Sequence, residues 1–345
     1  MTSAKTKFWL PPIVNQLNGE ERAAGFEIEF GNVAVSEAAI ALQKALGGQL
    51  KQENPFLYRL KDSRVGTLRI ERDFELLNSV RYRDYLQGLD IDYEPGTAMS
   101  EIEHGIDRLS RNLVPCEIVT SPIKLNDLNG LNDIIQVLHT LDARGSGHSI
   151  ISAFGTHINP SAPDLSAVTI THYLQAFLLL YDWIVWDSKI DFTRRYITHY
   201  IDPFPKAYLE LLLDSSYQPD EGQLIDDYLD YNPTRNRALD LLPLMCEIDE
   251  EKVLQGVNPN EKSLIKKRPA FHYRLPDCRV GDEGWSIATE WNRWWYVEVI
   301  ANDEDLRKAL MALWQKNSKE LSLPGSDAWA KKTDGFLCER IEVAA

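Results

Sequence analysis

The sequence predicts an α+β fold: a curved, mainly antiparallel sheet with flanking helices and a helical insertion. Two observations lead to this prediction. Several short segments alternate polar and apolar residues, which is typical of strands with one face in the core. Between them lie longer stretches whose apolar residues recur three and four positions apart, which is typical of helices. No internal repeat is present, and we expect a single domain over residues 1–345.

The segment Gly25–Phe30 is the most informative of the predicted strands. Because side chains alternate along a strand, Glu27 and Glu29 share one face and the apolar residues share the other. Two adjacent carboxylates repel each other unless a cation, a proton or a basic ligand lies between them. Oxygen-only pairs suit hard cations such as Mg²⁺. Taken alone, the segment fits either a metal site or a solvated strand face.

Four further segments repeat this arrangement of chemically capable groups opposite apolar ones. The polar faces carry Glu71, Asp73 and Glu75 in 68–75, Glu117 in 116–122, His157 and Asn159 in 155–160, and His272 and Arg274 in 271–275. A solvated sheet face more usually holds Thr, Lys and Ser than Glu, His and Asn. We therefore expect the five strands to form one wall of a cavity.

Helical spacing predicts helices over 36–46, 125–141, 168–186 and 303–316, and an acidic segment in the helical region at 221–231. The chain then divides into an N-terminal sheet half at 23–160, a helical insertion at 164–256, and C-terminal strands and helices at 257–345. Within the last part we expect strands and loops over 262–299. The cluster of Trp291, Trp294 and Trp295 fits either an aromatic wall for a ligand or packing in the core.

Composition argues against several classes of partner. Lys and Arg total 37 against 52 Asp and Glu, a net charge of −15, which disfavours nucleic acid. No apolar run reaches the roughly 18–20 residues of a membrane span, so we expect no membrane partner. The first residues lack the apolar stretch of a secretory signal and the four cysteines are scattered, which predicts a cytoplasmic protein with reduced thiols. P-loop and Rossmann nucleotide motifs do not occur in the sequence.

The order of the motifs is also informative. Glu-x-Glu follows Gly25, an acidic strand comes next, then Glu-Ile-Val-x-Ser-Pro at 117–122 and Gly-x-His-x-Asn at 155–159. This order resembles the amidoligase family, carboxylate–amine ligases related to glutamine synthetase and glutamate–cysteine ligase. The resemblance covers 23–160 and resumes at 232–241 and 268–274. It implies a sheet of the glutamine synthetase and glutamate–cysteine ligase type. The chain departs from the family at Asn159, which is usually His, and at His272, which is usually Glu.

The resemblance implies ATP- and Mg²⁺-dependent formation of an amide or isopeptide bond through an acyl phosphate, on a peptide or amino-acid-like small molecule. Together with the residue types, it suggests three sets of site residues: metal ligands Glu27, Glu29, Asp73, Glu117, His157 and Asn159; ATP-binding residues Arg235, Lys267, Arg268 and His272; and catalytic residues Glu71, Arg237 and Arg274. The basic run at 266–268 fits either contact with phosphate or a solvated loop. Guanidinium groups suit phosphate and carboxylate because they bind two oxygens at once. A carboxylate such as Glu71 suits the removal of a proton from the amine.

Two alternatives stay open: a metal-dependent hydrolase that uses the acidic cluster, and a non-catalytic binding descendant of the ligase fold. Self-association of the chain is also open.

Repulsion between the like charges of the carboxylates leads to one further prediction, on the stability of the metal-free protein. Glu27→Gln and Glu117→Gln should each leave its stability unchanged or slightly raised.

Overall fold

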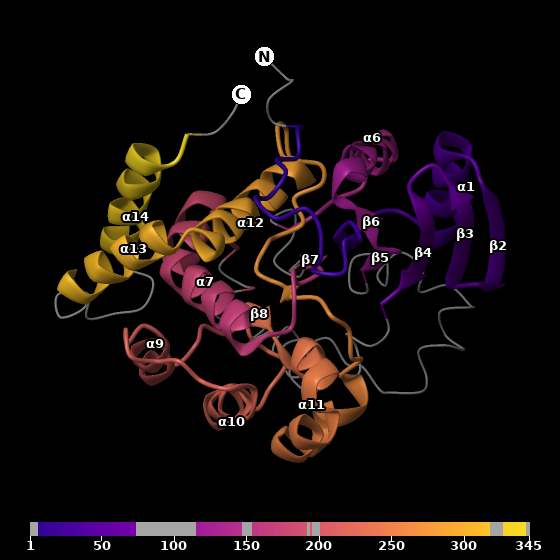
Figure 1. Cartoon of the computed structure of the whole chain (residues 1–345). Helices are drawn as coiled ribbons and strands as arrows, with labels where there is room; N and C mark the ends of the chain where they lie inside the picture. The colour runs from indigo at the N-terminus through magenta and orange to yellow at the C-terminus, as the bar shows by residue number, and fades with distance from the viewer. Residues whose placement is uncertain are drawn as a thin grey trace, which may run out of the picture.

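The computed structural model of the chain describes residues 6–73, 115–146, 154–191, 194, 201–317 and 327–342. Two expectations from the sequence fall outside these ranges. Glu75 lies outside the described residues, and so does most of 187–200, where the sequence predicts that the helix at 168–186 continues after a break. Figure 1 shows the arrangement of the described elements.

A nine-stranded sheet runs through the described residues, and all the strand pairs within it are antiparallel. Its order is β2-β3-β4-β5-β1-β7-β9-β8, with β6 paired to one end of β1. The strands are β1 Ala23–Phe30, β2 Gln49–Asn54, β3 Leu57–Ser63, β4 Gly66–Arg72, β5 Cys116–Thr120, β6 Ile123–Lys124, β7 Thr156–Pro160, β8 Leu239–Asp240 and β9 His272–Tyr273. The α+β class with an open antiparallel sheet and flanking helices is thus confirmed.

Helices account for most of the remaining described chain. They are α1 Val35–Leu46, α6 Leu131–Thr140, α7 Ala167–Ser188, α9 Lys206–Leu212, α10 Glu221–Tyr231, α11 Leu242–Gly256, α12 Ile287–Asn302, α13 Glu304–Asn317 and α14 Asp327–Arg340, with 3₁₀ turns at Leu125–Gly130 and Pro259–Leu264. The helix predicted over 125–141 therefore begins as a 3₁₀ turn. Asp303 caps α13, since its carboxylate accepts the N–H of Leu306 at 2.9 Å.

The apolar face of the sheet is the one that the helices cover. Phe26, Ile28 and Phe30 of β1 are fully buried, and Phe26 packs against Trp291 of α12 with ring centroids 6.2 Å apart. Helix α1 lies against β3 and β4, while α7 packs against α12 and α14 (Figure 1). Tyr273 of β9 contacts residues of both α7 and α12. The carboxylates of β1 are consequently left on the opposite face.

The expectation of strands and loops over 262–299 is wrong in its second half, where α12 begins at Ile287. Trp291 and Trp294 are three positions apart and both fully buried, which is the spacing of one helical face. The side chain of Ser286 starts the helix by accepting the N–H of Thr289. The aromatic cluster thus belongs to the core in its first two members, and Trp295 packs on Trp9.

Helix α7 is the described helix that is long and apolar enough to cross a membrane by length and composition. Its most apolar window is 78% buried inside the structure, which is also what a core helix shows. Ser166 caps its first turn by accepting the N–H of Thr169. Its length is therefore weak support for a membrane span.

A buried ion pair joins the start of the sheet to the helices. Arg22, one residue before β1, donates to both oxygens of Glu298 on α12 at 2.7 and 2.9 Å, and both side chains are 0% exposed. Tyr173 of α7 and Trp294 also donate to this carboxylate. The remaining Arg22 donors bond to the carbonyls of Ile13 and Ser161. Every charge in the pair is thus compensated by directed hydrogen bonds.

We predict that Glu298→Gln destabilises the protein by about 3–5 kcal/mol, because it leaves the buried Arg22 guanidinium without its charge partner. The matched control is Glu53→Gln, which breaks the surface pair between Glu53 and Arg59 and should leave the free energy of unfolding nearly unchanged, since water screens an exposed pair. Chemical denaturation measures both. Equal, small losses in the two variants would show that the buried pair does not hold the helices to the sheet.

Candidate functional site

Strand register places the predicted polar groups side by side on the face of the sheet opposite the packed helices. Glu27 of β1 lies opposite His157 of β7, and Glu29 lies opposite Glu117 of β5. Glu117 in turn lies opposite Glu71 of β4. Residues directly opposite on neighbouring strands have their Cβ atoms about 4.5–5.5 Å apart. The pairing therefore concentrates four carboxylates and an imidazole over four strands.

Glu29, Glu117 and His157 form one close group. One ligand atom from each lies within 4.8 Å of the others; the two glutamates are buried, and the side chain of His157 is 12% exposed. Glu29 is held in place because its Oε2 accepts the backbone N–H of Gly155 at 2.7 Å. Its Oε1 lies 3.8 Å from Nε2 of His157, a separation that leaves room for an ion between the two atoms.

Glu117 has no compensating partner among the described residues, where no hydrogen bond or ion pair reaches its carboxylate. Burial raises its pKa well above the ordinary value, and the charges of Glu27, Asp73, Glu29 and Glu71 add to that shift. A proton or a cation is what relieves such a group. Its pKa and its position thus both fit a cation ligand.

Glu27 behaves differently from Glu117. Burial alone would raise its pKa, but the hydrogen bond with His157 and the nearby charges hold that pKa well below the ordinary value. Oε2 accepts from Nδ1 of His157 at 2.7 Å, and Oε1 accepts from Nδ2 of Asn159 at 3.0 Å. Arg268 Nη1 lies 3.8 Å from Oε1. The premise of the prediction for Glu27→Gln, an uncompensated carboxylate at this position, therefore does not hold in the structure.

The tautomer of His157 follows from this hydrogen bond. An ionised carboxylate only accepts hydrogen bonds, so Nδ1 carries the proton and Nε2 carries the lone pair. Nε2 is the atom that faces Glu29. The imidazole is thus oriented by Glu27 to offer its lone pair to the Glu29–Glu117 pair, an arrangement common behind metal-binding histidines.

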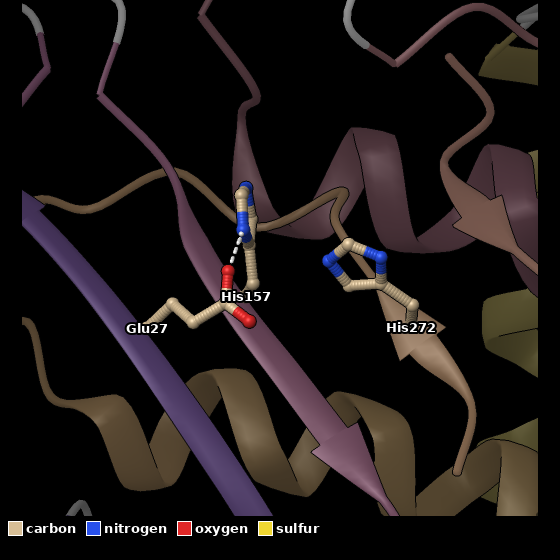
Figure 2. A group of neighbouring side chains, drawn as sticks. All are labelled: Glu27, His157 and His272. Carbon is tan, nitrogen blue, oxygen red and sulfur yellow. Dashed lines mark hydrogen bonds and ion pairs between the residues drawn. The ribbon is translucent and has the colours of Figure 1, made fainter. Parts of the chain in front are cut away.

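His272 of β9 lies next to this group, with its ring centroid 5.3 Å from that of His157. Figure 2 shows one of its ring nitrogens turned toward Glu27 and His157. Its Nδ1 lies 3.4 Å from Oδ2 of the buried Asp240. Burial lowers the pKa of His272 to about 3, despite the opposing effect of Asp240. The imidazole is therefore neutral near pH 7 and available as a ligand.

Three arginines stand close to the same groups. Arg235 Nε lies 3.7 Å from Oδ2 of Asp240, Arg268 approaches Glu27, and Arg274 donates to the backbone oxygen of Arg235 at 2.5 Å. Burial lowers the pKa of Arg274, and the charge of Arg235 lowers it further. The Nε atoms of all three are buried without a hydrogen-bond partner among the described residues. Such a group of partly satisfied guanidinium donors suits an oxyanion.

Two of the predicted residues are not brought into this cluster. Arg237 donates to Asn232 and to the carbonyls of Pro203 and Tyr231, so its guanidinium joins backbone segments of the helical region. Lys267 pairs with Glu250 of α11 at the surface, 2.9 Å apart. Their neighbours in the chain, Arg235 and Arg268, instead lie beside Asp240 and Glu27.

The remaining predicted residues lie at the edges of the cluster. Glu71 continues the row beyond Glu117 and pairs with Arg69 at 2.8 Å. Asp73 is close enough to Glu117 to raise its pKa. Oδ1 of Asn159 is buried and has no hydrogen-bond partner in the described part of the chain, so it remains available as an oxygen donor.

Asp240 is the residue that the sequence analysis missed. It is fully buried on β8, and its pKa stays below the ordinary value because His272 and the arginines outweigh the effect of burial. A signal was present, since Asp240 interrupts the apolar run Leu239–Leu242. Charged residues within such runs are rarely buried without a partner, which marks this carboxylate as a member of a polar network.

We predict opposite effects of two isosteric changes on the metal-free protein. Glu27→Gln should destabilise it by about 1.5–3 kcal/mol, the value of hydrogen bonds to a charged group. Glu117→Gln should leave stability unchanged or raise it at pH 8. The raised pKa of Glu117 favours folding below that pKa and ceases to do so as pH rises through it. The advantage of Glu117→Gln should therefore shrink as pH falls toward 5.

Thermal melts in the presence of a chelator, at pH 5 to 8, measure both effects. A Glu117→Gln variant that is less stable than wild type throughout this range would contradict the assignment of Glu117 as an uncompensated carboxylate. A neutral effect of Glu27→Gln would contradict the compensated state of Glu27.

Comparison with known proteins gives one match. The model of the family described as "Putative amidoligase enzyme" matches residues 20–296. No curated protein and no solved structure matches the chain closely enough to count as a relative. The matched range takes in the strands of the sheet and the whole polar cluster. Since the family model covers most of the sequence, the chain belongs to the amidoligase family.

Proposed function

We propose that this protein is an ATP- and Mg²⁺-dependent carboxylate–amine ligase that forms an amide or isopeptide bond through an acyl phosphate. The observation that carries the proposal is the buried group of Glu29, Glu117 and His157 beside three arginines with unsatisfied donors. Cation ligands and guanidinium groups on one sheet face are what the transfer of a phosphoryl group between anions requires. Family membership supports the ligase class.

The donor set fits Mg²⁺ in its chemistry. Glu29 and Glu117 supply carboxylate oxygens, which this ion prefers, and the lone pair of His157 completes the group. The uncompensated charge of Glu117 is the specific feature in favour of a cation. When bound, Mg²⁺ would neutralise charge on the phosphates of ATP.

The arginines would bind the anionic groups of the two substrates. Arg268 and Arg274 would bind the oxygens of the transferred phosphoryl group or of the substrate carboxylate, since each retains a buried Nε–H without a partner in the described residues. Arg235 is held beside Asp240 and would support them. This positive group next to the carboxylates favours an ordered approach of two anionic substrates.

Bond formation then needs a proton acceptor. The carboxylate of the substrate attacks the γ-phosphorus of ATP and ADP leaves, which gives the acyl phosphate. The amine attacks the acyl carbon, phosphate leaves, and the nitrogen loses a proton. We assign that proton to Glu71, which is the most exposed member of the carboxylate row, with a side chain 23% exposed. A small peptide or amino acid is the proposed substrate.

The nucleotide site makes a sharp prediction. Arg268→Ala and Arg274→Ala should each weaken ATP binding in the presence of Mg²⁺ by about tenfold or more, since a charge-assisted hydrogen bond is worth about 1.5–3 kcal/mol. Lys267→Ala is the matched control and should bind ATP like wild type, because its side chain faces Glu250. Isothermal titration measures all three. Unchanged binding in both arginine variants would contradict the assignment.

The reaction itself is tested by trapping. Hydroxylamine as the amine, with ATP, Mg²⁺ and a mixture of amino acids and short peptides, should give hydroxamate with the wild type and none with Glu117→Gln. Binding of Mg²⁺ without any binding of ATP at millimolar concentration would instead favour the hydrolase. Binding of neither would favour the non-catalytic binding protein.

A further inference from the structure

The group of Glu27, His157 and His272 is distinct in chemistry from the carboxylate pair beside it. One ligand atom from each of the three lies within 4.8 Å of the others. Two of the three donors are imidazole nitrogens. Nitrogen ligands favour borderline transition-metal ions such as Zn²⁺ over Mg²⁺, which prefers oxygen.

His272 has the features of a prepared ligand. Its side chain is 3% exposed, and its Nε2 is buried with no hydrogen-bond partner among the described residues. Since Nδ1 faces the carboxylate of Asp240, Nδ1 carries the proton and Nε2 keeps the lone pair. Figure 2 shows the ring nitrogen on the side away from the side-chain attachment turned toward Glu27 and His157. An unsatisfied buried nitrogen is costly unless something binds it.

Asp240 and His272 together reproduce the carboxylate–histidine arrangement that stands behind many zinc ligands. The carboxylate is itself held beside Arg235 and is fully buried. It has no access to the ion and would act only through the orientation of the imidazole. Asp240 is thus a positioning residue.

Glu27 can serve this group while it keeps the contacts of its other oxygen with Asn159 and Arg268. Its Oε1 accepts a hydrogen bond from Nδ2 of Asn159 and lies near Arg268, while its Oε2 faces Nδ1 of His157. An ion bound through Oε2 would therefore lie on the side away from the arginine. The proton on Nδ1 of His157 can move to Nε2, which faces Glu29, and this leaves the lone pair of Nδ1 for the ion.

We infer that Glu27, His157 and His272 form a second cation site, selective for a divalent transition-metal ion of the Zn²⁺ type, with Asp240 as its positioning residue. The site goes beyond the proposed ligase function and does not depend on ATP. It uses the opposite tautomer of His157 from the Glu29–Glu117 group. The two positions therefore compete for His157, and Zn²⁺ weakens the binding of Mg²⁺.

The test uses the full chain, stripped of metal, with Zn²⁺ and Mg²⁺ titrated separately and without nucleotide. Wild type should bind Zn²⁺ far more tightly than Mg²⁺. His272→Gln should weaken Zn²⁺ binding by more than about 100-fold, because it removes a ligand, and leave Mg²⁺ binding unchanged. Asp240→Asn should weaken Zn²⁺ binding by about 10- to 100-fold. His139→Gln, on the exposed face of α6, should leave it unchanged.

X-ray absorption at the zinc edge of the wild-type protein keeps the inference testable if the variants of buried residues fail to fold. It counts histidine ligands, and two are expected. One histidine or none, equal Zn²⁺ affinity in wild type and a folded His272→Gln, or equal affinity of the wild type for Zn²⁺ and Mg²⁺ would overturn it. The ligase proposal stands or falls separately, since hydroxamate formation requires ATP and Mg²⁺ but not Zn²⁺.

Discussion

The pairing of Glu29 opposite Glu117 at the centre of the sheet is the constraint on which the rest of the site depends. Antiparallel register brings these two carboxylates together, and burial removes the water that would screen them. The fold compensates one neighbour fully, since Glu27 has His157, Asn159 and Arg268 around it. It leaves Glu117 without such partners in the described chain. A cation bound next to Glu117 would therefore stabilise this face of the sheet.

The arginines and Asp240 show how the same face is balanced at its other end. The buried carboxylate of Asp240 offsets the repulsion between Arg235 and Arg274, because its negative charge attracts both guanidinium groups. His272 sits between this basic end and the carboxylates and is neutral. The face therefore changes from negative on β5 to positive near β8. Such a polarity suits the joining of two anionic reactants over one cation.

The sequence predicted the parts of the fold that depend on local alternation and spacing. Glu27 and Glu29 emerged on one face because Phe26 and Ile28 fill the core, and the apolar run of α7 became a helix within two residues of the predicted bounds. Helix α12 was missed because buried aromatic and β-branched residues occur in strands as well.

Within the site, prediction succeeded where the chemistry follows strand alternation and failed where it follows long-range contacts. His157 and Glu117 could be placed on the polar face from their own segments. The structural role of Arg237 could not be predicted from its own segment, because its partners include the backbone oxygens of Pro203 and Tyr231. The compensation of Glu27 likewise depends on residues more than a hundred positions away.

The central claim is that the Glu29–Glu117–His157 group holds a divalent cation. Anomalous diffraction from crystals grown with Mn²⁺ as a substitute for Mg²⁺ tests it most directly. The account predicts a peak at ligand distance from one oxygen of Glu29, one oxygen of Glu117 and Nε2 of His157. No peak on this face of the sheet, or one that Glu117 does not touch, would contradict it.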